Sequence, residues 1–514
     1  MFTIQPSGSS KNGRGVTLKS IAATVALVTG SSAFAAATGG FSTTDGGNIA
    51  GAKSFTASTY QQINTIIANA KLDANGNKVT GGAYPLIITY TGNEDALINQ
   101  VIQDHTVNAS GNCPKARWND AYRFVEIKEF TKGITIIGAN GSSANFGVVV
   151  NKSNNVIVRN MKIGALAGAN NDADMVRIDS GSNVWIDHNE LFAVNNECNG
   201  SPDGDLTFES ALDIKKDSHN ITVSYNVIRD SKKVGLDGSS STDIAGGREI
   251  SFHHNIYRNV NARLPLQRGG WTHMYNNLYD GITGSGINVR QAGYALIENN
   301  WFQNSLNPVT CRYDSSNCGK WELRGNNITN PGDFATYNIT WSSGGTIDAT
   351  NWTTTAPFPI TLPYSYAPVS PQCVKDKLAQ FAGVGKNGAQ LTAAACSGTA
   401  SSSPAASSKP ASSSIAAVSS SRSSSSTAAA SSRPASSASG APVLTGTGDY
   451  PDGFSKCADL GGTCSVTSGD GWVAFGRKGK WVTKRVSVPG SIACTVAAFG
   501  SDPLGNPNKC SYKR

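Results

Sequence analysis

The middle of the chain repeats one short pattern of apolar and polar positions. Each copy is an alternating run that ends on asparagine, and the six copies are Val156–Asn160, Trp185–Asn189, Thr222–Asn226, Ser251–Asn255, His273–Asn277 and Leu296–Asn300. Alternation over a few residues is typical of a strand with one buried face. The final asparagines are 29, 37, 29, 22 and 23 residues apart. Repeats of about 20 to 50 residues indicate a solenoid.

An all-β, stacked solenoid is the fold that this pattern favours. Asparagine tolerates left-handed backbone at a bend, and its amide can form a ladder between stacked turns, so the repeat predicts a parallel β-helix. A sandwich of antiparallel hairpins is the alternative, but two-residue turn signals are scarce between the runs. The unequal intervals predict loops that leave the stack and hold the functional site. Residues Ser58–Ala70 predict a short helix that covers one open end.

Composition divides the chain into four parts. Residues 1–35 have the order of a secretory signal, with a basic start, the apolar run Ile21–Val28 and Ala33-Phe-Ala35, after which cleavage is expected. No apolar segment reaches the length of about 20 residues that a membrane span needs, so we expect a secreted, extracellular protein without a membrane partner. The predicted β-helix spans residues 36–396. Residues 397–444, rich in Ser, Ala and Pro, predict a disordered linker, and residues 445–514 a small module.

The charge pattern points to an acidic polysaccharide as partner. The formal net charge is +8, yet no Lys/Arg run exceeds two residues and no nucleic-acid motif is present, which argues against nucleic acid. From Gly446 onward the chain has nine Lys/Arg and five Asp, a net charge of 9 − 5 = +4. This module also contains aromatic residues that suit either stacking on sugars or a small core: Trp472, Phe475, Trp481, Phe499 and Tyr512.

Ten cysteines fit an exported protein. Six lie in the first domain and four in the last module, and even counts in each part indicate disulfides within each part. No Cys-x-x-Cys pair is present, so a zinc site is not expected.

Two basic segments follow an acidic one in the central region. Asp172-Ala-Asp174 comes first, then Ser231–Asp237 with Lys233, then Asn261–Arg268. Arg263 and Arg268 are five residues apart, which on a regular strand sets them on opposite faces. Pro265 interrupts that regularity, so both guanidinium groups can point to one side. Such a cluster suits a carboxylate-bearing substrate; a solvated basic loop is the alternative.

These segments resemble the catalytic region of the extracellular pectate lyases of polysaccharide lyase family 1. The matching stretches are Lys232–Gly238, Asn261–Arg268, Gly284–Arg290, Val184–Asn189 and Glu209–Asp213, and the resemblance runs roughly from Thr38 to Cys396. It implies a right-handed parallel β-helix and a monomeric, secreted enzyme that cleaves polygalacturonate, or de-esterified pectin, by β-elimination to 4,5-unsaturated oligogalacturonates. The cofactor that it implies is Ca²⁺. It also favours the disulfides Cys113–Cys198, Cys311–Cys318 and Cys373–Cys396.

The resemblance implies a role for each residue of the charged set. Calcium ligands are expected at Asp174, Glu209 and Asp213, with Asp172 as a fourth. Arg263 is expected to be the base, with Lys233 and Arg268 holding the substrate carboxylate. Arginine normally keeps its proton, so this role requires neighbouring cations to disfavour the charged form, and it predicts activity that rises into alkaline pH.

Four other polar residues receive weaker assignments. We interpret Asp187 as a structural residue within a stacked strand. His253 and His254 are interpreted as stacked or ladder residues on a repeat strand, because no nucleophile–base motif accompanies them. Arg290 fits substrate contact and packing at a strand end equally well.

Three alternative functions remain at this stage. A pectin lyase on the same fold acts on methylated substrate without calcium, and the acidic set argues against it. A polygalacturonase needs paired acids and gives a saturated product. A non-catalytic pectin-binding solenoid is the third, and the Lys233, Arg263 and Arg268 set distinguishes a lyase from it.

Overall fold

The computed structural model describes residues 38–397 and 444–513. The first range has gaps at 115–121, 169–172, 199–206, 245–247, 313–317 and 343–346, and the second at 469–470, 487, 489, 500–502 and 504–507. The chain divides into two compact units, Met1–Ala405 and Ala406–Arg514, and each is described by itself. The predicted signal peptide and nearly all of the predicted linker lie outside the described residues.

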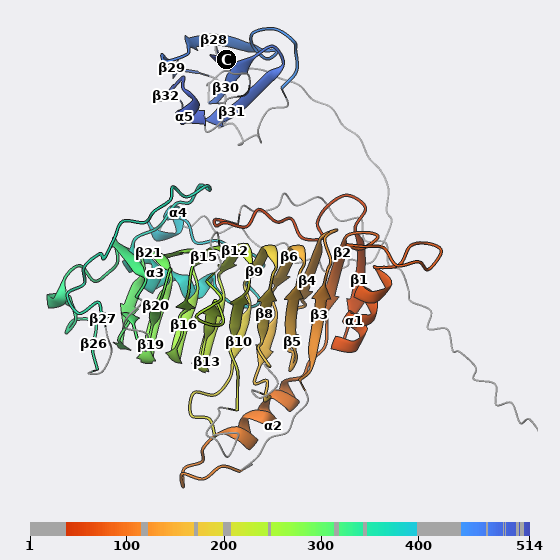
Figure 1. The fold of residues 1–514 in the computed structure, drawn as a ribbon, viewed down its shortest axis with the longest axis vertical. Helices are drawn as coiled ribbons and strands as arrows, with labels where there is room; N and C mark the ends of the chain where they lie inside the picture. Colours follow the sequence, from red (N-terminus) through yellow and green to blue (C-terminus); the bar gives the residue numbers. More distant parts are fainter. Residues whose placement is uncertain are drawn as a thin grey trace, which may run out of the picture. The chain divides into compact units, whose positions relative to one another are not determined.

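The first unit is a parallel β-helix, in which consecutive strands fall into three long sheets (Figure 1). The ten-stranded sheet contains, in spatial order, β1 (Lys53–Ala57), β2 (Leu86–Tyr90), β4 (Ile134–Gly138), β6 (Asn154–Arg159), β9 (Ser182–Asp187), β12 (His219–Ser224), β15 (Glu249–His253), β18 (Trp271–Tyr275), β21 (Tyr294–Glu298) and β25 (Lys320–Arg324). The six-stranded sheet contains β7 (Lys162–Gly164), β10 (Glu190–Phe192), β13 (Val227–Lys233), β16 (Ile256–Ala262), β19 (Leu278–Ser285) and β22 (Trp301–Gln303).

The nine-stranded sheet completes each coil. Its strands are β3 (Phe124–Lys128), β5 (Gly147–Asn151), β8 (Val176–Asp179), β11 (Leu212–Lys215), β14 (Gly235–Asp237), β17 (Leu266–Gln267), β20 (Ile287–Val289), β24 (Val309–Cys311) and β27 (Ile347–Asp348), the last antiparallel to β24. A small sheet pairs β23 (Ser305–Leu306) with β26 (Ile339–Thr340). Apolar side chains from the three long sheets fill one continuous core, because each strand turns alternate residues inward.

A ladder of asparagines runs along the inside of the coils, as the repeat predicted. At each step one side-chain oxygen accepts from the backbone N–H and the amide of the asparagine one coil earlier. The members are Asn189, Asn226, Asn255, Asn277, Asn300 and Asn326.

The sequence alignment of the first repeat was wrong by one residue. Arg159 pairs with Asp187, so Asn160 is the counterpart of His188, not of Asn189. Left-handed backbone also falls on the residue before each ladder asparagine, with φ of 54° at His188, Tyr225 and His254. The ladder asparagines are therefore selected for their amides and not for their backbone conformation.

Helices and arms cover the surfaces that the coils leave open. Helix α1 (Tyr60–Asn69) confirms the predicted cap and buries Ile63 and Ile67 in the core. Helix α2 (Asp95–His105) projects beside the six-stranded sheet (Figure 1) and was not predicted. The other helices among the described residues of this unit are α3 (Pro371–Lys377), α4 (Ala393–Cys396) and the 3₁₀ turns η3 (Pro331–Asp333) and η4 (Leu378–Gln380).

The two ends of this unit lie on the coils. Residues 38–47 cross the ten-stranded sheet: Ser42 N–H donates to Thr222 Oγ1 (3.0 Å) and Gly47 N–H to Thr135 Oγ1 (2.8 Å). The C-terminal arm packs Val374 and Leu378 into a second apolar cluster with Trp301. Three disulfides join Cys113–Cys198, Cys311–Cys318 and Cys373–Cys396, the same pairs that the resemblance favours.

The second unit is a small antiparallel module. Its four-stranded sheet has the order β28 (Phe454–Asp459), β33 (Lys509–Lys513), β30 (Trp472–Arg477) and β31 (Lys480–Arg485), and β29 (Thr463–Val466) pairs with β32 (Gly490–Ala493). Helix α5 spans Val496–Phe499, and the disulfides are Cys457–Cys464 and Cys494–Cys510.

The module uses its aromatic residues in two ways. Phe475 and Tyr512 are buried in its core, and Phe499 stacks on Phe475 with ring centroids 4.9 Å apart. Trp472 and Trp481 remain partly exposed. Three of the five aromatic residues therefore belong to the core of the module, which is one of the two roles that the sequence suggested for them.

Candidate active site

The predicted charged residues that the structure describes lie on strands of the nine-stranded sheet or next to their ends, on successive coils. Strand β11 shows why they face outward: Leu212 and Ile214 belong to the core, so alternation turns Asp213 and Lys215 to the outer face. Asp174 precedes β8 and Glu209 precedes β11, one coil further along.

Asp174 and Asp213 form a buried acidic pair. Asp174 is 0% exposed and Asp213 1%. One oxygen of Asp174 accepts from Ser210 N–H at 3.2 Å, and one oxygen of Asp213 accepts from Leu236 N–H at 3.0 Å. Burial raises the pKa of Asp174 well above its usual range, and the negative charge of Asp213 raises it further. The pair is thus a place where a cation is favourable.

In the protein without metal, Lys215 places a positive charge beside this acidic pair. Its Nζ lies 2.8 Å from Asp213 Oδ2 and 3.3 Å from Asp174 Oδ2. Burial acts to lower the pKa of Lys215, but the two carboxylates outweigh it and raise the pKa. This residue was not predicted from the sequence. Its spacing of two from Asp213 on a strand could have revealed it, because residues i and i+2 share a face.

Glu209 and Lys233 pair across neighbouring coils. Lys233 is the last residue of β13, and its ammonium forms a short ion pair with the Glu209 carboxylate. The backbone fixes this contact, because the Lys233 carbonyl accepts from Ala211 N–H at 3.3 Å. The structure therefore brings a predicted calcium ligand against a predicted substrate-binding lysine.

Arg263 lies one coil beyond Lys233. It follows β16, has a left-handed backbone with φ 70°, and its carbonyl accepts from Gly235 N–H at 2.8 Å. Within the described ranges, no carboxylate lies at ion-pair distance from its guanidinium.

Arg268 lies at the other end of β17. Its Nη1 donates to the Gly238 carbonyl at 3.1 Å, and its own carbonyl accepts from Nη1 of the buried Arg248 at 2.6 Å. Arg248 also pairs with Asp243 at 2.6 Å. Arg248, which the sequence analysis did not consider, thus fixes the backbone at Arg268.

Not every predicted ligand can be placed. Asp172 lies outside the described residues. In the part of the chain that the structure describes, no group of three His, Cys, Asp or Glu side chains is arranged to hold a metal ion. Asp174 and Asp213 are held together, whereas Glu209 is turned to Lys233.

The residues interpreted as structural are all buried away from this set. Asp187 pairs with Arg159 at 2.7 Å and with His188 at 2.8 Å. His254 stacks on Tyr225 and His253 on Tyr275, with centroids 4.6 and 4.8 Å apart.

Two further residues complete the description of this region. Arg290 follows β20 and is 9% exposed. Glu197, which the sequence analysis did not consider, accepts from the N–H groups of Thr207 and Phe208 at 2.8 and 2.9 Å, just before Glu209. Burial raises the pKa of Glu197 to about 7.

Comparison with known proteins identifies the family. The family model described as pectate lyase matches residues 15–387. The chain belongs to the pectate lyase family. Pectate lyase C from Dickeya chrysanthemi is 62% identical over 361 residues, 70% of this chain and 93% of that protein. Pectate lyase 3 from Pectobacterium atrosepticum is 60% identical over 382 residues, 74% of this chain and 99% of that protein.

Solved structures of pectate lyases share the fold. Pectate lyase C from Erwinia chrysanthemi at pH 9.5 with 30 mM Ca²⁺ has a TM-score of 0.65 and 61% identity, over 70% of this chain and 99% of that one. An arginine-to-lysine mutant of pectate lyase C in complex with pentagalacturonic acid has a TM-score of 0.65 and 60% identity over the same shares. This pectate lyase is therefore a polysaccharide lyase on a parallel β-helix. No helix in the described ranges is long and apolar enough to cross a membrane.

Proposed function

We propose that this pectate lyase cleaves polygalacturonate by calcium-dependent β-elimination to 4,5-unsaturated oligogalacturonates. The observation that supports this most is the order of charges on successive coils: a buried acidic pair at Asp174 and Asp213, then Lys233, then Arg263, which has no acidic partner among the described residues. An acidic site beside a basic one suits a divalent cation and an anionic sugar together.

The acidic residues fit calcium by their chemistry. Carboxylate oxygens are the hard donors that calcium prefers. Burial, and after it the negative charge of Asp213, raises the pKa of Asp174, so a bound cation would be favourable there. Asp174, Asp213 and Glu209 would hold the ion, with Asp172. When bound there, calcium would supply positive charge to the C6 carboxylate of the substrate and so make the C5 proton more acidic.

Arg263 is the proposed base. It accepts the C5 proton, the C–H electron pair becomes the C4=C5 double bond, and the C4–O bond breaks with its electron pair on the oxygen, which takes a proton from water to give the new reducing end. Arginine resists deprotonation, so the positive charges of Lys233 and Arg268 have two functions here. They hold the substrate carboxylate, and they disfavour a further positive charge beside them.

Ultraviolet absorbance of the unsaturated product tests this proposal. With polygalacturonate at mildly alkaline pH, we expect absorbance with calcium and none with excess chelator. Arg263→Lys should abolish the signal, whereas Arg258→Lys, on an exposed side chain of the same coil, should leave it unchanged. New reducing ends without absorbance would indicate hydrolysis and refute the eliminative mechanism.

Export and polymer attachment extend this function. We infer that residues 1–35 direct secretion, that the enzyme is monomeric, and that the C-terminal module binds pectin. In the module, Arg485 lies opposite Trp472 on the neighbouring strand, 6.0 Å from its ring, which suits an acidic sugar. The double variant Trp472→Ala/Trp481→Ala should elute earlier from immobilised pectin, while Leu460→Ala, an exposed apolar residue of the module, should not. Unchanged retention of the double variant would refute the assignment.

A further inference from the structure

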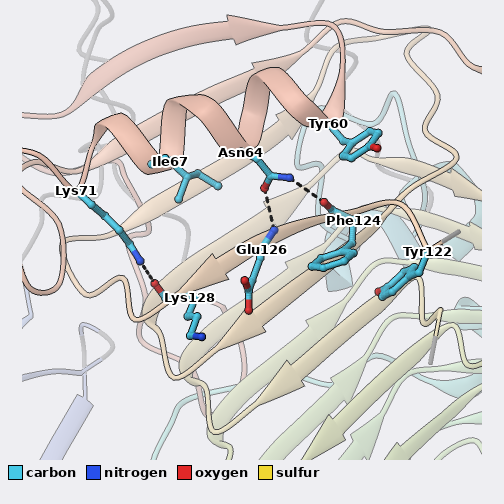
Figure 2. A pocket seen from close by; sticks show the side chains of 9 residues that line it. Tyr60, Asn64, Ile67, Lys71, Tyr122, Phe124, Glu126 and Lys128 are labelled. Carbon is cyan, nitrogen blue, oxygen red and sulfur yellow. Dashed lines mark hydrogen bonds between the residues drawn. The ribbon is translucent and has the colours of Figure 1, made fainter. Parts of the chain in front are cut away.

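A groove of about 460 Å³ lies between α1 and β3, at the end of the β-helix that α1 covers (Figure 2). Three aromatic and two basic side chains are among the residues that line it: Tyr60, Tyr122, Phe124, Lys71 and Lys128. Neither the acidic pair nor the basic residues of the catalytic set belong to it.

Asn64 makes this groove a fixed part of the fold. Its side-chain nitrogen donates to the Phe124 carbonyl at 2.9 Å, and its oxygen accepts from Glu126 N–H at 3.0 Å (Figure 2). Helix α1 is thereby bonded to backbone groups at the edge of β3, which are no longer open to an added strand. A ligand of this groove must therefore bind through side chains.

The side chains suit an acidic sugar chain. Tyr122 and Phe124 stack with ring centroids 4.8 Å apart and planes at 25°, which forms an aromatic strip for a sugar ring. At the other end of the groove, the Lys71 ammonium is held by the Lys128 carbonyl, and the Lys128 side chain is exposed. Between them, Glu126 accepts from Asn151 at 3.2 Å. Ammonium groups attract uronate carboxylates, and Glu126 offers an acceptor to sugar hydroxyls.

Tyr122 connects the groove with the catalytic coils. Its hydroxyl donates to the Asp174 carbonyl at 2.9 Å. The ring crosses the coil between them at Gly147, where a Cβ atom would lie 2.7 Å from the Tyr122 hydroxyl and 2.4 Å from the Asp174 carbonyl. From β3 the outer face continues over β5 and β8 to Asp213 on β11. The distance from β3 to β11 is three strand spacings, or about 14 Å.

We propose that the groove between α1 and β3 is a distal subsite for the galacturonate polymer, which it holds about three coils away from the acidic pair of Asp174 and Asp213. The occupant is a uronate chain, recognised by the aromatic strip and by Lys71 and Lys128. The inference rests on the proposed function for its substrate. It predicts that the enzyme distinguishes long chains from short ones, because a short oligomer bound at Asp174 and Asp213 does not reach this groove.

Charge reversal in the groove tests the proposal in the full chain. Lys128→Glu and Phe124→Ala are compared with Lys132→Glu, whose exposed side chain lies outside the groove. Rates on long polygalacturonate and on trigalacturonate are measured for each variant. We expect the KM for the polymer to rise about fivefold in Lys128→Glu, the effect of losing one favourable exposed charge contact. The KM for trigalacturonate should stay unchanged, and Lys132→Glu should match the parent on both substrates.

Equal KM values of Lys128→Glu and Lys132→Glu on the polymer would refute the subsite, as would an equal loss on trigalacturonate. If a neutral glucan competes with polymer binding as strongly as a uronate chain does, the groove is a general sugar site and the uronate assignment is refuted. Polymer affinity of Arg263→Lys, with and without Lys128→Glu, measures the groove independently of turnover. The groove is therefore tested even if the eliminative mechanism fails.

Discussion

The ammonium of Lys215 lies 2.8 Å from the carboxylate of Asp213, and the same group reaches Asp174 at 3.3 Å. One partly buried cation thus offsets two buried carboxylates in the protein without metal. Because calcium is proposed to bind the same two carboxylates, Lys215 and calcium supply charge to one site.

Lys215→Met should make the stability of the enzyme depend on calcium. Without calcium, two buried carboxylates lose their cation, and we expect the free energy of unfolding to fall by about 3 kcal/mol. Added calcium should restore part of this loss, so the calcium-induced rise in Tm should be larger in the variant than in the parent. Thermal unfolding with chelator and with calcium measures both.

Lys216→Met provides the matched control. Lys216 neighbours Lys215 but is 61% exposed and pairs with Asp179 at 3.3 Å. Its loss should therefore change neither the free energy of unfolding nor the calcium-induced rise in Tm by much. If calcium shifts the Tm of Lys215→Met and of the parent equally, calcium does not bind at Asp174 and Asp213.

Arg248→Met should destabilise the coils around Arg268. Arg248 is 1% exposed and binds both the Asp243 carboxylate and the Arg268 carbonyl. Its removal leaves a carboxylate without its cation in a largely buried place, which costs about 3–5 kcal/mol. Urea unfolding should show this loss, while Arg258→Met, on a side chain that is 55% exposed, should stay within about 1 kcal/mol of the parent. Equal midpoints for the two variants would contradict the role assigned to Arg248.

The sequence was sufficient to predict the coil repeat, because strand alternation and the asparagine ladder both leave a periodic signal. It did not place Asn160 correctly, because an asparagine in left-handed backbone and a ladder asparagine look alike in sequence. Nor did it find Asn326, the last member of the ladder, since the residue before it is Gly325 with φ 59° and the run lacks the pattern of the other copies.

The catalytic set was predicted through resemblance, and its supporting residues were not. The spacing of two between Asp213 and Lys215 was a local signal, and it was overlooked. Arg248 and Arg268, by contrast, lie one coil apart and are 20 residues apart in sequence. No local pattern marks such pairs. Helix α2 lay in a segment without the strand repeat, and its weak amphipathic pattern, with Ile98 and Val101 buried, was overlooked.

Glu197 should make the stability of the enzyme fall as pH rises towards neutrality. Burial raises its pKa from about 4.5 to about 7. Between these values the folded protein binds a proton that the unfolded chain has released, so stability declines over this window, by about 3 kcal/mol at most. Glu197→Gln cannot ionise and should show a flatter dependence between pH 4.5 and 7 in urea unfolding with chelator present. Parallel curves for variant and parent would show that Glu197 ionises normally.

Asn255→Ala should be among the most costly single changes in the β-helix. Asn255 Oδ1 accepts from the N–H and the amide of Asn226, and its own amide donates to the Val223 carbonyl at 2.9 Å. Alanine leaves these buried groups without partners, each at about 1–3 kcal/mol, so we expect a loss of about 3 kcal/mol or more. Asn99→Ala, on an exposed position of α2, makes the same chemical change where no ladder exists, and should be neutral or slightly stabilising. Urea unfolding measures both variants, and a loss in Asn255→Ala no greater than in Asn99→Ala would mean that packing alone, without the amide ladder, sets the register of the coils.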